Sequence, residues 1–255
     1  MKALSPRTAV VLVHGGYHGA WCWDRLVPFF DAPTLAVDLP GRGSRPMPVD
    51  DVTIEVAADS VLADIEAAGL DRVVLVGHSL AGASLPAIAG RLGDRAVHLV
   101  FVSCLVVPDG QSVLGMTPVG QRQAADSRLR AGSGERTELS ADHHRALLAN
   151  DLDDEQCAYV LDHVGADSMR FFTDTVTWSP HVRGRPKTYV RLLQDRAVPL
   201  PEQDEMIRRL GPGVAVHDID AGHEVMITKP GQLAAIVVPL LDDADRGLPP
   251  SARPH

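Results

Sequence analysis

Three residues that can together perform nucleophilic catalysis occur in this chain in an informative order. Ser79 lies in the run Gly77-His78-Ser79-Leu80-Ala81-Gly82, Asp195 follows a later apolar run, and His223 comes after the last one. A serine hydroxyl is a poor nucleophile at neutral pH and needs a base that removes its proton. A histidine does this near pH 7 when a carboxylate fixes its tautomer and stabilises the imidazolium. The order Ser79, Asp195, His223 therefore predicts a nucleophile, an acid and a base on one α/β sheet.

Other acids and histidines are weaker candidates for these roles. Asp109, which comes after the strand that follows the serine, is the rival for the acid. Asp38 precedes the serine and is interpreted as structuring its own loop, and Asp220 is too close in sequence to His223 to face its ring. Of the 11 histidines, only His223 follows the last predicted strand in a turn of small residues. The remaining alternative is a set of three unrelated polar loop residues, which the matching order and placement disfavour.

The serine stands where a predicted strand meets a predicted helix. Residues 73–76 are four aliphatic side chains in a row, typical of a buried strand, and 81–92 has the composition of a helix. A strand, a tight turn with the serine at its tip and a helix form the context of a nucleophile elbow. Small residues are needed there because the serine backbone is strained and the helix passes close to the strand. Ala81 stands where the pattern usually has its second glycine, and Gly82 is directly behind it.

A glycine-rich turn, His14-Gly15-Gly16-Tyr17-His18-Gly19, follows the first predicted strand. Glycines just beyond a strand let backbone N–H groups point into a cleft. Such donors stabilise the oxyanion that forms during acyl transfer. Gly16 is therefore a candidate oxyanion donor, with an ordinary glycine-rich turn as the alternative.

Strand-like and helical runs alternate along the chain, which predicts an α/β fold with a mostly parallel, six-stranded sheet and helices on both faces. The predicted strands are 9–13, 34–37, 73–76, 96–105, 187–193 and 214–219. Ligands of such sheets bind beyond the carboxyl ends of the strands. Because Ser79, Asp195, His223 and the Gly15-Gly16 turn each follow a strand, we expect them at the same edge.

One large domain with an insertion is expected from the length of 255 residues. Strand-like runs disappear between about 111 and 185, where charged, helix-leaning segments replace them. This pattern predicts a helical cap inserted over the mouth of the sheet. The predicted division is a core of 1–105 and 186–245, a cap of 106–185 and a disordered tail of 246–255.

Composition and charge favour a soluble cytoplasmic protein. The formal net charge of −9, without a run of lysines or arginines, disfavours nucleic-acid and anionic-membrane partners. Cys22, Cys104 and Cys157 are interpreted as buried free thiols, and neither a disulfide framework nor a zinc site has support. The N-terminus leaves no room for a signal peptide, and no apolar run approaches the ~18–20 residues that a membrane span needs.

The motifs resemble those of the α/β-hydrolase superfamily, and within it the small-lid group of plant methyl esterases and hydroxynitrile lyases with their bacterial esterase relatives. The matching segments are His14-Gly15-Gly16-Tyr17-His18-Gly19-Ala20-Trp21-Cys22-Trp23, Gly77-His78-Ser79-Leu80-Ala81-Gly82, Gln194-Asp195-Arg196-Ala197-Val198-Pro199 and Gly222-His223. The resemblance runs from about Val10 to Ile236 and is weakest in the cap. It implies an oxyanion hole made of the backbone N–H groups of Gly16 and Leu80.

Two departures from the lyases of this group bear on activity. The lyases have a threonine where this chain has Gly15, and a lysine directly after the catalytic histidine, where this chain has Glu224. In the lyases that lysine holds the negative charge of the leaving cyanide. A carboxylate would oppose that charge, so the resemblance does not imply lyase activity. Glu224 itself is expected either in the pocket or on a rim that faces solvent.

Together these features predict a hydrolase that cleaves a small-molecule carboxylic ester through an acyl-enzyme, without a metal or a cofactor. The alternatives are a thioesterase, a lactonase or a C–C bond hydrolase with the same three residues, and a ligand-binding protein on a hydrolase scaffold. The candidates for lining the substrate pocket are Gly15, Tyr17, His78, Glu224 and Trp178. Apolar cap residues such as Trp178 suggest a hydrophobic acyl or alcohol group, although packing onto the core is their commoner fate. Formation of a homodimer is left open.

Overall fold

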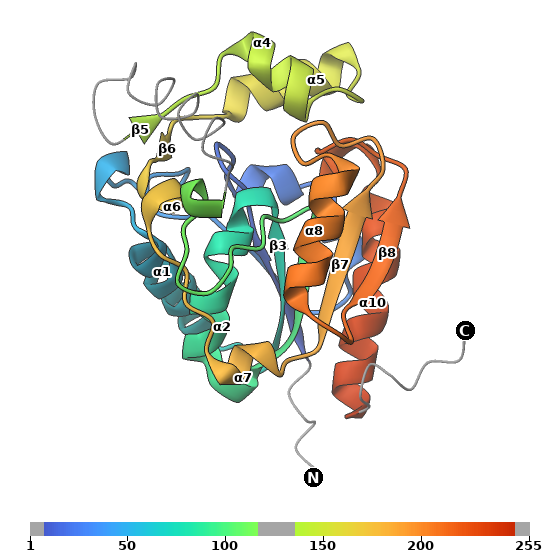
Figure 1. Ribbon diagram of the computed structural model, residues 1–255. Helices are drawn as coiled ribbons and strands as arrows, with labels where there is room; N and C mark the ends of the chain where they lie inside the picture. The colour runs from blue at the N-terminus through green and yellow to red at the C-terminus, as the bar shows by residue number, and fades with distance from the viewer. Residues whose placement is uncertain (1–7, 117–135, 248–255) are drawn as a thin grey trace.

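A single sheet of six strands forms the centre of the protein (Figure 1). The computed structural model describes residues 8–116 and 136–247. The strands are β1 (Ala9–Val13), β2 (Thr34–Val37), β3 (Val73–His78), β4 (Ala96–Val102), β7 (Lys187–Leu192) and β8 (Ala215–Ile219). They lie in the order β2-β1-β3-β4-β7-β8, and each neighbouring pair is parallel. The predicted α/β fold with a six-stranded sheet is confirmed.

The central strands are buried on both faces, which explains their unbroken apolar sequences. Every residue of β1 and of β3 is buried, as expected for parallel strands covered by helices on both sides. Because side chains alternate across a strand, Val11 and Val13 belong to one core cluster, whereas Val10 and Leu12 belong to the other. In contrast, β8 is an edge strand in which only Ile219 is buried.

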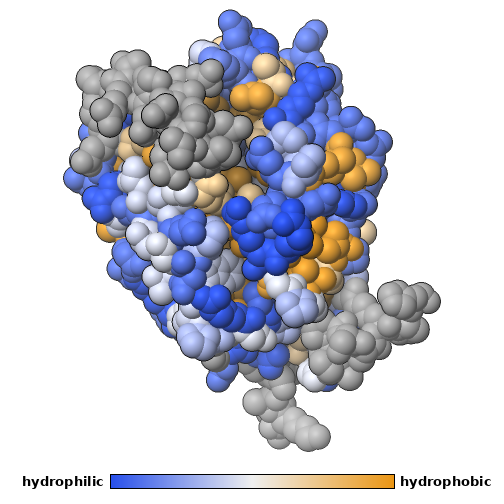
Figure 2. Space-filling model, in the orientation of Figure 1, coloured by the Kyte–Doolittle hydropathy of each residue, from blue (hydrophilic) through white to orange (hydrophobic). Residues whose placement is uncertain are grey.

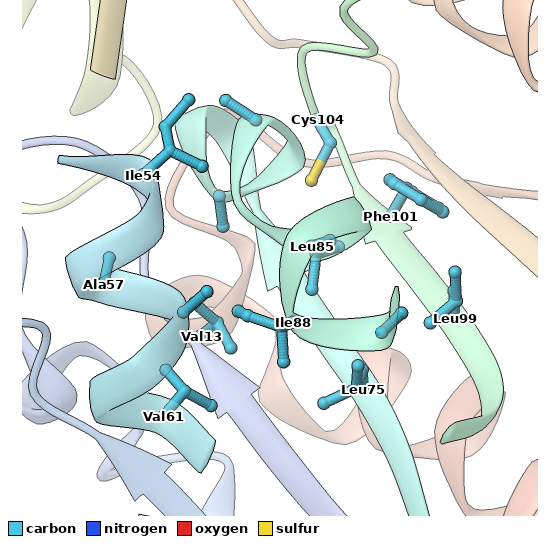
Figure 3. Close-up of a cluster of buried hydrophobic side chains, with 14 of the residues drawn as sticks. Val13, Ile54, Ala57, Val61, Leu75, Leu85, Ile88, Leu99, Phe101 and Cys104 are labelled. Carbon is cyan, nitrogen blue, oxygen red and sulfur yellow. The ribbon is translucent and has the colours of Figure 1, made fainter. Parts of the chain in front are cut away.

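Helices cover both faces of the sheet. The first cluster packs the sheet against α1 (Ile54–Ala67) and α2 (Leu85–Leu92), as Figure 3 shows, and also includes a side chain of α8 (Leu200–Leu210). The second packs it against α9 (Val225–Thr228) and α10 (Pro230–Arg246). The short 3₁₀ helices are η1 (Ala20–Trp23), η2 (Val27–Phe29), η3 (Val49–Asp51), η4 (Ser79–Ala83), η5 (Gly93–Arg95) and η6 (Leu114–Met116).

The segment predicted as a cap is divided between two ends of the sheet. Its elements are β5 (Arg136–Thr137), α4 (Ala141–His143), the π-helix η7 (His144–Leu148), α5 (Asp154–His163), β6 (Asp167–Ser168), α6 (Arg170–Thr173) and α7 (Pro180–Arg183). In Figure 1, α4 and α5 lie over the carboxyl edge of the sheet, whereas α7 lies near its opposite end beside α2. The domain boundaries remain a prediction, and the predicted tail lies outside the described residues from 248 onward.

The surface and the cysteines agree with a globular chain. Cys22, Cys104 and Cys157 are buried free thiols, which confirms their interpretation. In the part of the chain that the structure describes, no helix combines the length and the apolar character needed to cross a bilayer. The face in Figure 2 is mainly hydrophilic, with apolar patches between polar side chains. The large apolar side chains exposed among the described residues are Phe29, Met47, Leu147 and Val216.

Candidate active site

Ser79 follows β3 directly and is the first residue of η4. Its φ of 53° lies in the left-handed region, which residues other than glycine rarely adopt. Strain of this kind persists only where the surroundings hold it in place. The buried strand precedes Ser79, and the Ser79 carbonyl accepts a 3.0 Å hydrogen bond from Leu105 N–H on the neighbouring segment. The local structure is thus the strand–turn–helix arrangement of a nucleophile elbow.

Two glycines make this turn sterically feasible. A Cβ on Gly77 would lie 2.6 Å from Leu85 Cδ1, and a Cβ on Gly82 would overlap the carbonyl oxygen of Leu105. The methyl group of Ala81 is accommodated and buried. On the helix side of the serine, the position that excludes a side chain is therefore Gly82. It lies one residue beyond the place where the motif usually has its second glycine.

Replacing Gly82 with alanine is expected to lower the free energy of unfolding by at least about 2 kcal/mol, because the obstructing atom belongs to the backbone and cannot rotate away. Gly90 in α2 is the matched control, since a Cβ there would meet only Val182 and Ser179, at 3.8 and 3.9 Å. Gly90→Ala should raise stability by about 0.5–1 kcal/mol, because alanine favours the helix. Urea unfolding of both variants measures the contrast, and equal effects would contradict the steric argument.

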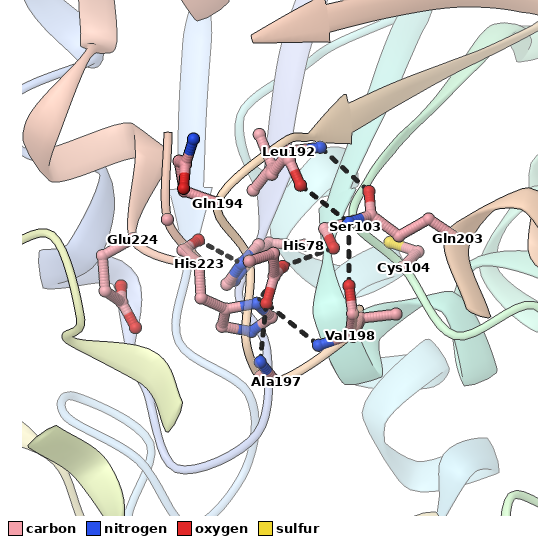
Figure 4. A network of polar contacts seen from close by, with 12 residues as sticks. His78, Ser103, Cys104, Leu192, Gln194, Ala197, Val198, Gln203, His223 and Glu224 are labelled. Atoms are coloured by element: carbon pink, nitrogen blue, oxygen red, sulfur yellow. Dashed lines mark hydrogen bonds and ion pairs between the residues drawn. The ribbon is translucent and has the colours of Figure 1, made fainter. Parts of the chain in front are cut away.

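Asp195 and His223 are joined by a short hydrogen bond at the carboxyl edge of the sheet. His223 Nδ1 donates to Asp195 Oδ2 at 2.7 Å, and the same oxygen accepts from Ser103 Oγ at 2.6 Å. Asp195 Oδ1 accepts from the backbone N–H groups of Ala197 and Val198, at 2.8 and 2.9 Å. In Figure 4, Ser103, Ala197, Val198 and His223 lie around this carboxylate, which accepts a hydrogen bond from each of them. With four donors around it, the carboxylate is held in a single orientation.

The buried pair has the charges that a base and its partner require. Burial disfavours ionisation of both groups, but their mutual attraction outweighs it. The pKa of Asp195 is therefore lowered, with further help from Ser103, and the pKa of His223 is raised. The raised value means that the imidazolium formed after proton abstraction is stabilised. Only 6% of Asp195 and 2% of His223 are exposed, so bulk water screens this attraction little.

His78, the residue before the serine, is hydrogen-bonded to the backbone of the proposed base. Its Nε2–H donates to the His223 carbonyl at 3.0 Å, and the two ring centroids are 4.4 Å apart. Burial, reinforced by the charge of His223, lowers the pKa of His78 well below its ordinary value, so this ring is neutral.

Among the described residues, none is hydrogen-bonded to the Ser79 hydroxyl. Catalytic hydrogen bonds are often long before substrate binds and tighten in the complex.

The glycine-rich turn after β1 lies against the serine. A Cβ on Gly15 would come within 3.0 Å of Ser79 Cβ and 3.1 Å of His78 Nδ1, so a threonine would be crowded at this position. A Cβ on Gly16 would lie 3.0 Å from Leu80 Cδ2. The two predicted oxyanion donors, Gly16 and Leu80, are therefore neighbours in the folded chain.

The Gly16 N–H is left available for a ligand. His14 Nε2 accepts from Leu39 N–H at 3.1 Å, so its Nδ1–H donates to the Gly15 carbonyl at 2.8 Å. Burial lowers the pKa of His14 to about 3, which keeps this ring neutral. The carbonyl end of the Gly15–Gly16 peptide is thus fixed, whereas its N–H has no acceptor among the described residues. A small pocket here is lined by Gly16, Leu80, Leu39, Phe171 and an ion pair between Arg42 and Asp167.

The remaining predicted pocket residues have different positions. Tyr17 lies beside the pocket, and its hydroxyl is 3.3 Å from Thr137 Oγ1. Glu224 is fully buried, so the expectation of a solvent-facing rim carboxylate is wrong. Trp178 belongs to the core. Its ring stacks with that of Phe101, with the ring centroids 6.2 Å apart, and its Nε1–H donates to Val107 O at 2.8 Å.

The alternative candidate for the acid, Asp109, is bonded to partners other than His223. Asp109 accepts from Trp178 N–H at 2.7 Å and pairs with Arg183 at 2.7 Å.

The described residues contain no group of three or more His, Cys, Asp or Glu side chains suited to a metal.

Sequence reasoning missed several residues of this site. Ser103 bonds Asp195, and its position just after β4, the strand beside the serine strand, was the available signal. Asp151, whose carboxylate accepts from Gly222 N–H at 2.6 Å, carries no such signal. The same holds for Asp167 and Arg42, which the fold brings to the pocket from separate segments.

Comparisons with known proteins identify the family and agree with the fold. Residues 10–236 match the sequence model of the alpha/beta hydrolase family. Esterase PIR7B of Oryza sativa subsp. japonica is 29% identical over 92% of this chain and 96% of its own. The pyrethroid hydrolase of Sphingobium wenxiniae is 25% identical over 92% of this chain and 88% of its own. An extracellular alpha/beta-hydrolase from a Paenibacillus species has the same fold, with a TM-score of 0.81 at 21% identity, over 91% of this chain and 98% of that chain.

Proposed function

Because this chain belongs to the alpha/beta hydrolase family, we propose that it is a serine esterase that cleaves a small-molecule carboxylic ester through an acyl-enzyme. In this proposal Ser79 is the nucleophile, His223 the general base and Asp195 the acid that orients it. The observation that carries the proposal is the 2.7 Å hydrogen bond between Asp195 and His223 at the sheet edge where Ser79 forms its strained turn. The chain order of the three is the one found in α/β-hydrolases.

Acylation begins with proton transfer from Ser79 Oγ to His223 Nε2. The Ser79 oxygen attacks the ester carbonyl carbon, and the carbonyl oxygen becomes an oxyanion. The N–H groups of Gly16 and Leu80 stabilise this charge, each by about 3 kcal/mol in the transition state. Leu80 is suited to this because it lies in the first turn of η4, where N–H groups have no partner within the helix.

Collapse of the tetrahedral intermediate breaks the bond to the alkoxide, which takes the proton from His223 and leaves as the alcohol. Water then enters, His223 removes one of its protons, and the hydroxide attacks the acyl carbon. Ser79 leaves as the alkoxide and recovers its proton from His223, which yields the free acid and the resting enzyme.

The substrate class is supported by the pocket and by the relatives. The pocket beside Gly16 and Leu80 combines the apolar side chains of Leu39 and Phe171 with the Arg42–Asp167 pair. The names of the relatives in rice and Sphingobium describe an esterase and a pyrethroid hydrolase. The proposal thus concerns a small ester, hydrolysed in the cytoplasm by the single chain or a homodimer. Thioesters, lactones and C–C bonds are the alternatives that the same residues could cleave.

A fluorophosphonate probe tests this proposal directly. We expect the purified protein to acquire one probe per chain, attached to Ser79, and to lose hydrolysis of p-nitrophenyl acetate in proportion to labelling. Peptide mass spectrometry locates the adduct, and heat-denatured protein is the control. An unlabelled protein without turnover on a panel of esters, thioesters and lactones would support a ligand-binding role instead.

A further inference from the structure

A buried ion pair lies next to the proposed base. Glu224 follows His223 in sequence, and its Oε1 is 2.9 Å from His18 Nε2. The side chains of His18 and Glu224 are 1% and 0% exposed. Burial opposes both charges, but attraction between them raises the pKa of His18 and lowers that of Glu224 to about 2. Their attraction therefore favours the charged forms, an imidazolium and a carboxylate. In Figure 4, Glu224 lies apart from the hydrogen-bond network beside His223.

The second nitrogen of His18 holds the turn that contains Gly16. His18 Nδ1 donates to the Gly16 carbonyl at 2.7 Å. The N–H of the same peptide, which belongs to Tyr17, donates to Asp167 Oδ2 at 2.8 Å. The Gly16–Tyr17 peptide is thus fixed at both ends, by His18 at its carbonyl and by Asp167 of the inserted segment at its N–H. Its neighbour, the Gly15–Gly16 peptide, supplies an N–H that has no acceptor among the described residues.

We propose that Glu224 is a positioning residue for ester hydrolysis, which acts through His18 to fix the Gly16–Tyr17 peptide and so aims the Gly16 N–H at the developing oxyanion. This inference depends on the proposed function. Glu224 holds His18 Nε2 at 2.9 Å while Nδ1 donates to the Gly16 carbonyl, so the ring is fixed at both nitrogens. Without the carboxylate, the ring is anchored at Nδ1 alone and can rotate. The Gly16 carbonyl would then lose its fixed donor, and the turn would move.

The inference distinguishes two substitutions of the same residue. Leucine in place of Glu224 cannot bond His18, so Nε2 of the ring is no longer held in place. We expect Glu224→Leu to lower kcat by about 10- to 100-fold, because displacing an oxyanion donor costs less than removing it, which lowers kcat by about 10²- to 10³-fold. Glutamine can donate its amide N–H to Nε2 of a neutral His18, which leaves Nδ1 protonated toward Gly16. Glu224→Gln should therefore recover most of the lost kcat.

The deciding measurement is the affinity for an aryl trifluoromethyl ketone. Its adduct with Ser79 is a hemiketal whose oxyanion occupies the hole, so its inhibition constant reports on the donors. We expect Glu224→Leu to raise this constant by the same factor by which it lowers kcat, with KM for p-nitrophenyl acetate nearly unchanged. His98→Asn is the control, since His98 is a buried histidine bonded to Thr188 near the amino end of β4. It should alter stability and leave the inhibition constant unchanged.

The outcomes separate this inference from the proposed function. If wild-type protein is labelled and active, and Glu224→Leu binds the ketone as tightly as the wild type does, the positioning role is wrong. A loss in Glu224→Leu that glutamine does not recover, or that His98→Asn matches, would also overturn it. If Glu224→Leu fails to fold, His18→Asn and His18→Gln replace it. Asparagine can keep the Nδ1-like donor to Gly16 and should retain more activity than glutamine. Wild-type protein that is neither labelled nor active overturns the esterase proposal itself.

Discussion

Alanine at position 79 is expected to lower kcat for p-nitrophenyl acetate by about 10⁴- to 10⁶-fold. The substitution removes the attacking oxygen and leaves the strained turn, the Asp195–His223 pair and the N–H groups of Gly16 and Leu80 in place. Residual turnover should therefore remain above the uncatalysed rate, because these groups still bind and polarise the ester. The stability of the variant should change little, since no described residue is hydrogen-bonded to the Ser79 hydroxyl.

Ser84→Ala is the matched control for this experiment. Ser84 is buried at the start of α2, and its hydroxyl donates to Ala81 O at 3.1 Å, within the same turn as the proposed nucleophile. Its removal should cost about 1 kcal/mol of stability and leave turnover near the wild-type level. Burst kinetics on both variants measure the fraction of competent sites and exclude contamination by wild-type enzyme. Turnover of Ser79→Ala within tenfold of the wild type would assign the nucleophile to another residue.

The fold could be predicted from sequence because its signals are local. Each strand of a sheet covered on both faces is a short apolar run, and β1 and β2 have the bounds that were predicted. The order of strands and the edge at which Ser79, Asp195 and His223 lie follow from general rules of parallel sheets. The later strands end within three residues of their predicted carboxyl ends, which is where the site residues begin.

The supporting contacts could not be predicted because their partners are far apart in sequence. His18 and Glu224 are 206 residues apart, and Tyr17 and Asp167 are 150 apart. Neither residue of such a pair has a local pattern that distinguishes it from other histidines or acids on the surface. Glu224 illustrates the difficulty, since a charged residue after the base indicated a pocket or solvent-facing position. Only the folded chain brings His18 close enough to Glu224 to make burial of this carboxylate favourable.

Trp178 shows the same difficulty for an apolar residue. Its position in the inserted segment suggested contact with substrate, but the segment returns to the core after β6. The residue is 7% exposed, and its ring stacks with that of Phe101. An apolar side chain carries no information about which of two apolar surroundings it occupies.

Asp195→Asn is expected to lower kcat by about 10⁴-fold while leaving the fold intact. The structure gives a specific reason. Oδ1 accepts from two backbone N–H groups, of Ala197 and Val198, so the amide oxygen of asparagine must take that position. Its NH₂ group then faces His223 Nδ1, which has to accept instead of donate. The proton of a neutral His223 is forced onto Nε2, the atom that should remove the proton of Ser79.

The pH profile adds a second readout with a definite sign. Asp195 raises the pKa of His223, and His223 acts as a base only when it is neutral. Activity in the wild type should therefore fall as the pH drops through that raised pKa. In Asp195→Asn the attraction is lost, so the acidic limb of kcat/KM should move to lower pH, on top of the smaller rate. The stability that the carboxylate contributes is present above the ordinary pKa of an aspartate and is lost as the pH falls through its lowered value.

Asp109→Asn is the comparison that makes the assignment testable. Asp109 bonds Trp178 N–H and Arg183, and neither partner approaches His223 in the described structure. We expect this variant to lose stability, with kcat and the position of the acidic limb nearly unchanged. If Asp109→Asn instead lost the greater part of kcat and Asp195→Asn retained it, the acid would have to be Asp109. The two asparagine variants carry the same chemical change, so a difference in their pH profiles can arise only from which carboxylate faces the base.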